Sequence, residues 1–133
     1  MTYLLDTHTL IWATLETIKL SKIVKDIISN RNNEIFVSTV TFWEIALKVS
    51  IKRLSFEKMN IKDFPKYAQE MGFTIMDLKE GETITFHELP LKEYHKDPFD
   101  RMLVWQAITN DMILISKDNL LKQYEEDGLR IIW

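Results

Sequence analysis

The sequence predicts an α/β fold, a three-layer α/β/α sandwich in which helices cover both faces of a short, mainly parallel central sheet. Two observations predict this class. Short apolar runs alternate with longer segments that have helical spacing, the pattern of buried parallel strands joined by crossover helices. The length of 133 residues, with only 3 Gly and 3 Pro, fits one domain spanning residues 1–133 without a flexible linker.

The predicted strands are short and apolar. They are Tyr3–Leu5, Ile35–Val37, Phe73–Leu78, Met112–Ile115 and Leu129–Trp133. The segments with helical spacing are Thr7–Leu15, Lys22–Ser29, Thr41–Ile51, Ile61–Met71, Glu80–Glu88, Pro98–Asn110 and a turn at Asn119–Tyr124. Local signals support several boundaries: Ser21 is a good N-cap, Gly72 a helix stop, and Asp97-Pro98 a helix start. Arg31–Asn33 reads as a turn and Leu89–Lys96 as a loop.

The composition excludes several kinds of chemistry. The chain has no cysteine, which removes disulfides, thiolate metal sites and cysteine nucleophiles. Its three histidines are too scattered in sequence to suggest an imidazole-rich site. We therefore expect any metal to be a hard cation held by oxygen atoms.

The ends and the charge give weaker indications. The start carries Asp6 inside its only apolar stretch, which is not typical of a secretory signal, and no run of about 18 apolar residues predicts a membrane span. We expect a cytoplasmic protein with no membrane partner. The net charge of −3 argues mildly against a nucleic-acid substrate, unless divalent ions cancel the acids locally.

Four carboxylates fall where such a fold exposes the carboxyl edge of its sheet. Asp6 ends the first strand, Asp118 follows the fourth, Asp100 lies in the first turn of the helix after Pro98, and Glu44 lies in the helix after the second strand. Ligands bind at this edge in open parallel sheets. Each aspartate also fits a role in a helix start, and for Asp97 we prefer the N-cap.

Glu44 fits a purely structural role least well. Its helical neighbours are apolar apart from Lys48, and a buried glutamate is costly unless it is paired or binds a metal. An ion pair with Lys48 is the structural alternative. Together the four acids would repel one another unless a cation such as Mg²⁺ or Mn²⁺ intervened. Such a site suits phosphoester hydrolysis by a metal-activated water.

Four blocks of sequence, in this order, resemble the PIN-domain family, in particular its VapC-like toxins. They are LLDTHTLIW, STVTFWEIALKVSIKRL, DPFDRMLVWQA and ILISKD. The resemblance spans Tyr3 to Trp133 and implies that Asp6, Glu44, Asp100 and Asp118 are metal-binding, catalytic acids. It also implies cleavage of RNA to 5′-phosphate and 3′-hydroxyl ends, inhibition by a cognate antitoxin, and a homodimer.

Further residues are assigned lesser roles. Asp97 and Thr7 are possible auxiliary site residues, and Lys48 and Arg101 either balance charge or contact phosphate, with a salt bridge to a neighbouring acid as the alternative. His95 is assigned to the loop, with substrate contact as the minor option. Trp105 is bulkier than the small residues usual in this family, so helix packing or the dimer surface is expected to differ.

Two other functions remain as alternatives. A receiver-like or phosphatase-like domain would use one aspartate as phosphoryl acceptor, but it gives Glu44 and the DPFDR segment no role. A non-catalytic binding module would be expected to lack one of the acids, and all four are present. The sequence leaves open which RNA is cut, which antitoxin binds, and whether Asp118 contacts a metal directly.

Overall fold

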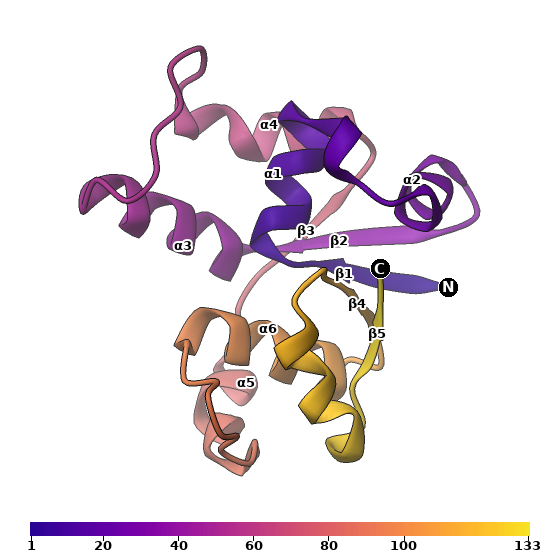
Figure 1. Ribbon diagram of the computed structural model, residues 1–133, viewed down its shortest axis with the longest axis vertical. Coiled ribbons are helices and arrows are strands. Elements are labelled where there is room, and N and C mark those ends of the chain that lie inside the picture. Colours follow the sequence, from indigo (N-terminus) through magenta and orange to yellow (C-terminus); the bar gives the residue numbers. More distant parts are fainter.

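The computed structural model describes all residues from 1 to 133 and confirms the α/β class. Its five strands form one sheet with the order β3-β2-β1-β4-β5, and every neighbouring pair is parallel. The strands are β1 (Thr2–Leu5), β2 (Glu34–Ser38), β3 (Thr74–Met76), β4 (Ile113–Ile115) and β5 (Arg130–Ile132). β1 is therefore the central strand (Figure 1).

Helices cover both faces of this sheet. The α-helices are α1 (Thr7–Leu15), α2 (Lys22–Ser29), α3 (Thr39–Ser50), α4 (Phe64–Glu70), α5 (Glu80–Thr85) and α6 (Pro98–Thr109), and the 3-10 segments are η1 (Thr17–Lys19), η2 (Ile61–Asp63), η3 (Phe86–Glu88) and η4 (Asn119–Asp127). Figure 1 shows α1, α2 and α4 on one face, with α5, α6 and η4 on the other. α3 extends outward from the carboxyl end of β2. None of these helices is long and apolar enough to cross a membrane.

The sheet separates two apolar cores because successive strand residues point to opposite faces. Tyr3 and Leu5 of β1 pack in the core beneath α1, α2 and α4, whereas Leu4 packs with Leu103 and Tyr124 on the other face. The strands are thus buried on both sides, which explains why their sequences are apolar without alternation.

Several boundaries differ from the sequence-based expectation. The helix predicted over Ile61–Met71 is divided, because Pro65 lacks an N–H and the α-helix begins only at Phe64. The helix predicted over Glu80–Glu88 likewise becomes a 3-10 turn from Phe86. The helical turn after β4 is longer than expected and ends where Gly128 adopts a φ of 103°.

The topology reverses direction between β1 and β4, the two strands at the middle of the order β3-β2-β1-β4-β5. The chain leaves β1 into α1 on one face and leaves β4 into η4 on the other face (Figure 1). Neighbouring parallel strands whose connections diverge in this way form a switch point, the usual ligand position in open α/β sheets. The residues that follow β1 and β4 are therefore the first candidates for a site.

Candidate functional site

Asp6 lies at the carboxyl end of β1 and is held there by both backbone and side chain. Its N–H donates to the Ile115 carbonyl of β4 at 3.1 Å, and its Oδ1 accepts from Thr9 N at 2.8 Å and Thr9 Oγ1 at 2.6 Å. It therefore caps α1, as the sequence allowed. Burial raises the pKa of Asp6, and hydrogen bonds from Ser116 and Thr9 offset this rise only in part. An opposing cation would stabilise its ionised form.

Glu44 is buried on α3 and faces the same edge. Its side chain is 2% exposed and forms an ion pair with Lys48, one helical turn away. The Thr7 hydroxyl, adjacent to Asp6, donates to Glu44 Oε1 at 2.5 Å. Burial lowers the pKa of Lys48, but its hydrogen bond and charge contact with Glu44, with Asp97 and Asp100 nearby, produce a net rise. The structural pairing of Glu44 with Lys48 is thus present beside the acid cluster.

Asp97 and Asp100 begin α6. Asp97 Oδ1 accepts from Phe99 N at 2.9 Å and from Asp100 N at 3.0 Å, which confirms it as the N-cap. Asp100 occupies the first turn, where the helix dipole favours a negative charge. Its side chain nevertheless remains free of any hydrogen bond from a protein donor. Asp97 therefore has a structural role as a cap, whereas the Asp100 side chain has none.

Asp118 follows β4 and caps η4. Its Oδ1 accepts from Leu120 N at 2.9 Å, and its own N–H donates to Ser116 Oγ at 3.1 Å. The second carboxylate oxygen, Oδ2, accepts no hydrogen bond from the protein. Asp118 therefore combines a cap with an oxygen available to a ligand.

The charges of these acids act on one another at Asp100. The pKa of Asp100 is raised to about 7, chiefly by burial and further by the charges of Asp97, Glu44, Asp6 and Asp118. Carboxylates influence one another to this extent only when they are close in space. The structure therefore places Asp6, Glu44, Asp97 and Asp118 close enough to Asp100 to act on its charge, and of the four sequence-predicted acids it brings Asp100 and Asp118 within the spacing of a shared ion.

His95 joins this cluster, and the sequence had placed it in a loop with substrate contact only as a minor option. Its side chain is 4% exposed, and its Nε2 lies 3.7 Å from Asp100 Oδ2. One potential ligand atom each from His95, Asp100 and Asp118 lies within 4.8 Å of the others. Burial lowers the pKa of His95, with Asp118 and Asp97 acting in the opposite direction and Arg101 adding to the decrease. The neutral imidazole is thereby favoured.

Arg101 does not face the acids. Its guanidinium donates to the Leu89 carbonyl at 2.8 Å, to the Pro90 carbonyl at 3.3 Å and to Tyr124 Oη at 3.3 Å. It forms no ion pair within 4.0 Å, so the salt bridge that the sequence offered as an alternative is absent. Arg101 holds the loop before α6 in place, and we therefore assign it a structural role in positioning this loop.

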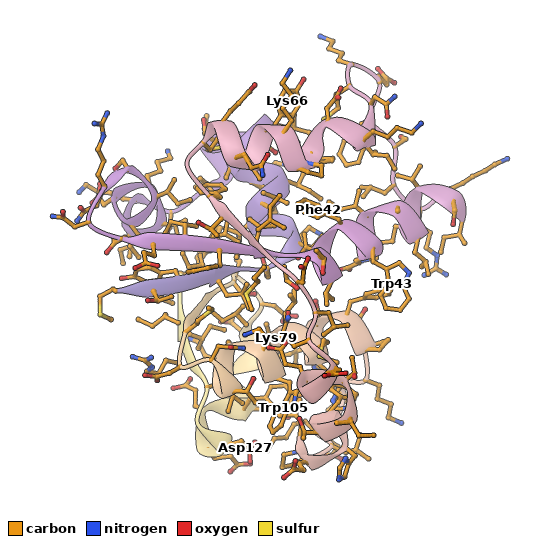
Figure 2. The ribbon with its side chains drawn as sticks, turned by 180° about the vertical axis from the view of Figure 1, so that it is seen from behind. Phe42, Trp43, Lys66, Lys79, Trp105 and Asp127 are labelled. Atoms are coloured by element: carbon orange, nitrogen blue, oxygen red, sulfur yellow. The ribbon has the colours of Figure 1, made fainter.

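The aromatic residues of α3 point to different surroundings. Figure 2 shows Phe42 pointing from α3 toward α4 and Trp43 pointing away from α4. Trp43 is exposed but packs edge-on against Phe99 at the start of α6, with 4.9 Å between ring centroids.

Trp105 of α6 donates from Nε1 to Thr85 Oγ1 at 3.1 Å and joins α6 to α5. Its bulk is thus used in helix packing.

A pocket of about 230 Å³ lies between α3 and α4, away from the acids. Phe42, Ile45 and Phe64 contribute apolar surface, and Lys62 is also among its lining residues. Ala46 on α3 is exposed within it. Such an apolar hollow is suited to an apolar side chain or helix of a partner.

The residues at the carboxyl edge fit a divalent cation. Carboxylate oxygens are its preferred ligands. Here those of Asp6 and Glu44 are buried, and those of Asp100 and Asp118 are not fully hydrogen-bonded. Their arrangement defines an α/β protein with an acidic site at its topological switch point. A family model for the PIN domain matches residues 3–127, and the chain belongs to the PIN domain family. This assignment disfavours the receiver-like alternative.

Solved structures of similar fold support the same architecture. VapBC2 from Rickettsia felis, bound to a DNA fragment from its promoter, gives a TM-score of 0.71 with 18% identity, covering 99% of this chain and 98% of that chain. VapBC-1 from nontypeable Haemophilus influenzae gives a TM-score of 0.64 with 16% identity, covering 99% of this chain and 97% of that chain. DNA-bound VapBC from Salmonella typhimurium gives a TM-score of 0.63 with 17% identity, covering 99% of this chain and 97% of that chain. No curated protein matches the chain in sequence.

Proposed function

We propose that this protein is a divalent-metal-dependent endoribonuclease and the toxin of a toxin–antitoxin pair. PIN domains are generally nucleases, and the similar structures are VapBC complexes. The observation that carries the proposal is the set of acids around Asp100, whose pKa is raised to about 7 first by burial and further by the charges of these acids. A cluster of this kind is unfavourable in a protein unless it binds cations.

The acids that would hold Mg²⁺ or Mn²⁺ are Asp6, Glu44, Asp100 and Asp118. When bound, such a cation supplies activation of water and neutralisation of charge on a phosphodiester. Thr7 orients the Glu44 carboxylate through its hydroxyl, and Lys48 pairs with that carboxylate. Asp97 fixes the start of α6 and thereby the direction of Asp100. Lys48 is partly exposed beside the acids, so it could also contact a substrate phosphate.

The test of this activity combines metal removal with charge-neutral variants. Purified protein is incubated with total RNA and with single-stranded DNA of matched length, with Mn²⁺ or Mg²⁺ and with EDTA. We expect cleavage of RNA with metal only, and its loss in Asp6→Asn and in Asp100→Asn. The matched control is Asp111→Asn, since Asp111 has a side chain 94% exposed and pairs only with Arg130. Cleavage that persists in EDTA, or in both site variants, would remove the proposal.

The antitoxin partner is proposed to contact the pocket between α3 and α4. The similar structures contain antitoxins, and this pocket presents apolar surface that an apolar antitoxin segment could cover. The variant Ala46→Asp places a charge on this surface at an exposed helix position, so folding should be unaffected. The probe is the product of a small reading frame found next to the gene, and we expect the variant to escape inhibition by it while cleaving RNA normally. Unchanged inhibition would place the contact elsewhere.

A homodimer is also proposed, on the resemblance to VapC-like proteins. Light scattering coupled to size-exclusion chromatography measures this directly. A monomeric mass at all concentrations would contradict it without affecting the nuclease proposal.

A further inference from the structure

His95 has a buried nitrogen that no hydrogen bond satisfies. Its side chain is 4% exposed, and Nε2 has no hydrogen-bond partner in the protein. Leaving a buried polar atom unpaired costs about 1–3 kcal/mol, so such an atom in a folded protein calls for a partner such as a water molecule or an ion. The atom faces the acid cluster, with Asp100 Oδ2 as its neighbour at 3.7 Å.

The orientation of the His95 ring is fixed from its other side. Nδ1 lies 2.7 Å from Tyr124 Oη, and the two rings pack edge-on with 5.4 Å between centroids. Tyr124 is fully buried and its oxygen also accepts from Arg101 Nε at 3.3 Å. Because the ring is held in this way, Nε2 can point only toward the acids.

The loop that carries His95 is itself anchored. Arg101 donates to the carbonyls of Leu89 and Pro90 at the start of the loop. Lys92 pairs with Asp127, at 2.7 Å, and with Glu126. The position of the imidazole is therefore built into the fold rather than left to a free loop.

His95 and two acids have the spacing of a coordination shell. The potential ligand atoms of His95, Asp100 and Asp118 lie within 4.8 Å of one another. Ligands about 2.1 Å from one octahedral ion are roughly 3–4 Å apart. A small rotation of the partly exposed Asp118 side chain would close the difference.

We propose that His95 Nε2 is a direct ligand of the divalent ion, together with Asp100 and Asp118, and that the site consequently prefers Mn²⁺ and related transition ions to Mg²⁺. This inference rests on the proposed function in that it requires a cation at the acids. Imidazole nitrogen suits first-row transition ions, whereas Mg²⁺ prefers oxygen ligands and retains its waters.

The proposed coordination also specifies the tautomer. Nδ1 carries the proton and donates it to Tyr124 Oη, which leaves the lone pair of Nε2 for the ion. Histidine ligands of metals commonly donate their second ring nitrogen in this way. In the opposing arrangement Nε2 carries the proton and donates to Asp100, and no bond to a metal can form.

The deciding measurement is binding of Mn²⁺ and of Mg²⁺ by calorimetry to the wild type and to His95→Asn. Asparagine keeps a donor near the Nδ1 position and removes the atom at Nε2. We expect the affinity for Mn²⁺ to fall by about 10–100-fold and the affinity for Mg²⁺ to change little. His87→Asn is the matched control, because His87 is exposed and its Nδ1 contacts only the Ile84 carbonyl.

A spectroscopic measurement and a second variant make the result independent of folding defects. In protein labelled with ¹⁵N-histidine, addition of Zn²⁺ should shift the Nε2 resonance of His95 alone. Tyr124→Phe retains the packing but removes the acceptor for Nδ1, and it should weaken Mn²⁺ binding by roughly tenfold. Thermal unfolding in EDTA confirms that each variant is folded.

The failure of this inference is distinct from the failure of the nuclease proposal. If the wild type and His95→Asn bind Mn²⁺ equally, or the Nε2 resonance does not move, then His95 is no ligand and only the inference is overturned. If the wild type binds no divalent ion and cleaves RNA in EDTA, the nuclease proposal fails as well.

Discussion

Glu44 and Lys48 show how one buried charge is tolerated beside several others. Glu44 is 2% exposed, and Lys48 is the basic side chain that pairs with it. Lys48 also lies close enough to Asp97 and Asp100 for both acids to raise its pKa. Without a metal, this lysine is therefore the cation that offsets repulsion among the acids.

Replacement of Lys48 by methionine should destabilise the metal-free protein. Breaking a buried pair usually costs about 3–5 kcal/mol, and the partial exposure of Lys48 reduces the expected loss to about 2 kcal/mol. Urea unfolding in EDTA measures the change, and Mn²⁺ should restore part of it. Lys66→Met is the control: the Lys66–Glu70 contact is exposed at 4.0 Å, so we expect a change below about 0.5 kcal/mol. Lys66 is labelled on α4 in Figure 2. Equal losses in the two variants would contradict this account.

Asp100 makes the stability of the metal-free protein depend on pH. Its pKa is about 7 in the folded protein against a usual value of 3.8, so between these values the folded state binds more protons than the unfolded state. The contribution of Asp100 to the free energy of unfolding therefore decreases as pH rises from about 4 to about 7.

The difference between wild type and Asp100→Asn isolates this contribution. We expect Asp100→Asn to be more stable than the wild type in EDTA at pH 8, by on the order of 1–3 kcal/mol, and the difference to vanish near pH 4. Unfolding in urea across this pH range provides the measurement. A difference that is constant with pH would show that the pKa of Asp100 is not raised.

Three of the acids at the carboxyl edge of the sheet are also the N-cap residues of helices. Asp6, Asp97 and Asp118 each accept hydrogen bonds from the first turn of the following helix. A helix N-terminus attracts negative charge, which partly explains why acids can accumulate at this edge. The remaining oxygens, and those of Asp100 and Glu44, form the candidate site.

Variants of Asp97 separate capping from chemistry. Asp97→Ala should lose about 1 kcal/mol of stability, and Asp97→Asn less, because asparagine also caps helices. We expect Asp97→Asn to keep most of its RNA cleavage, in contrast to Asp100→Asn. Ser21→Ala, which removes the cap of α2 far from the site, should lose similar stability with full cleavage. Loss of cleavage in a well-folded Asp97→Asn protein would instead assign Asp97 to the site.

The arrangement of the whole sheet decides which segments meet. β1 is central, α1 and η4 diverge to opposite faces, and α3 and α6 bring Glu44 and Asp100 to the same edge. A bound cation would therefore join residues from both helical layers. Its binding should stabilise the molecule as a unit.

A divalent ion at about 100 times its dissociation constant should raise the free energy of unfolding by about 2.7 kcal/mol. For a domain of this size the thermal midpoint should rise by roughly 5–10 °C, as measured by circular dichroism with Mn²⁺ against EDTA. Asp6→Asn should lose most of this rise, and Asp111→Asn should retain it. An equal rise in all three proteins would indicate binding outside the carboxyl edge.

The residues that could be predicted from the sequence are those with a strong local signal. The five strands are marked by short apolar runs, and Asp97-Pro98 marks the start of α6. Pro65 was also a signal that the helix before β3 begins late, and the sequence-based expectation overlooked it. The four acids were selected because each follows a predicted strand or lies near a helix start.

Other placements had no local signal. The segment from Leu89 to Lys96 has no apolar periodicity, so its sequence does not show that His95 is buried. Arg101 lies beside Asp100 in sequence, yet the helix turns it toward the loop carbonyls. Glu82 resembles an ordinary surface acid but is buried, where it accepts hydrogen bonds from Gln106 and Asn110.

The sequence alone determined the class of fold and the chemical type of the candidate site, because apolar periodicity and helix-start residues act over a few neighbouring positions. Only the tertiary structure decided that the other acids act on the charge of Asp100, that Lys48 pairs with Glu44 beside them, and that His95 faces Asp100. These relations depend on contacts between segments distant in the chain. Burial and the repulsion of neighbouring charges, which set the pKa of Asp100, arise only when those segments pack.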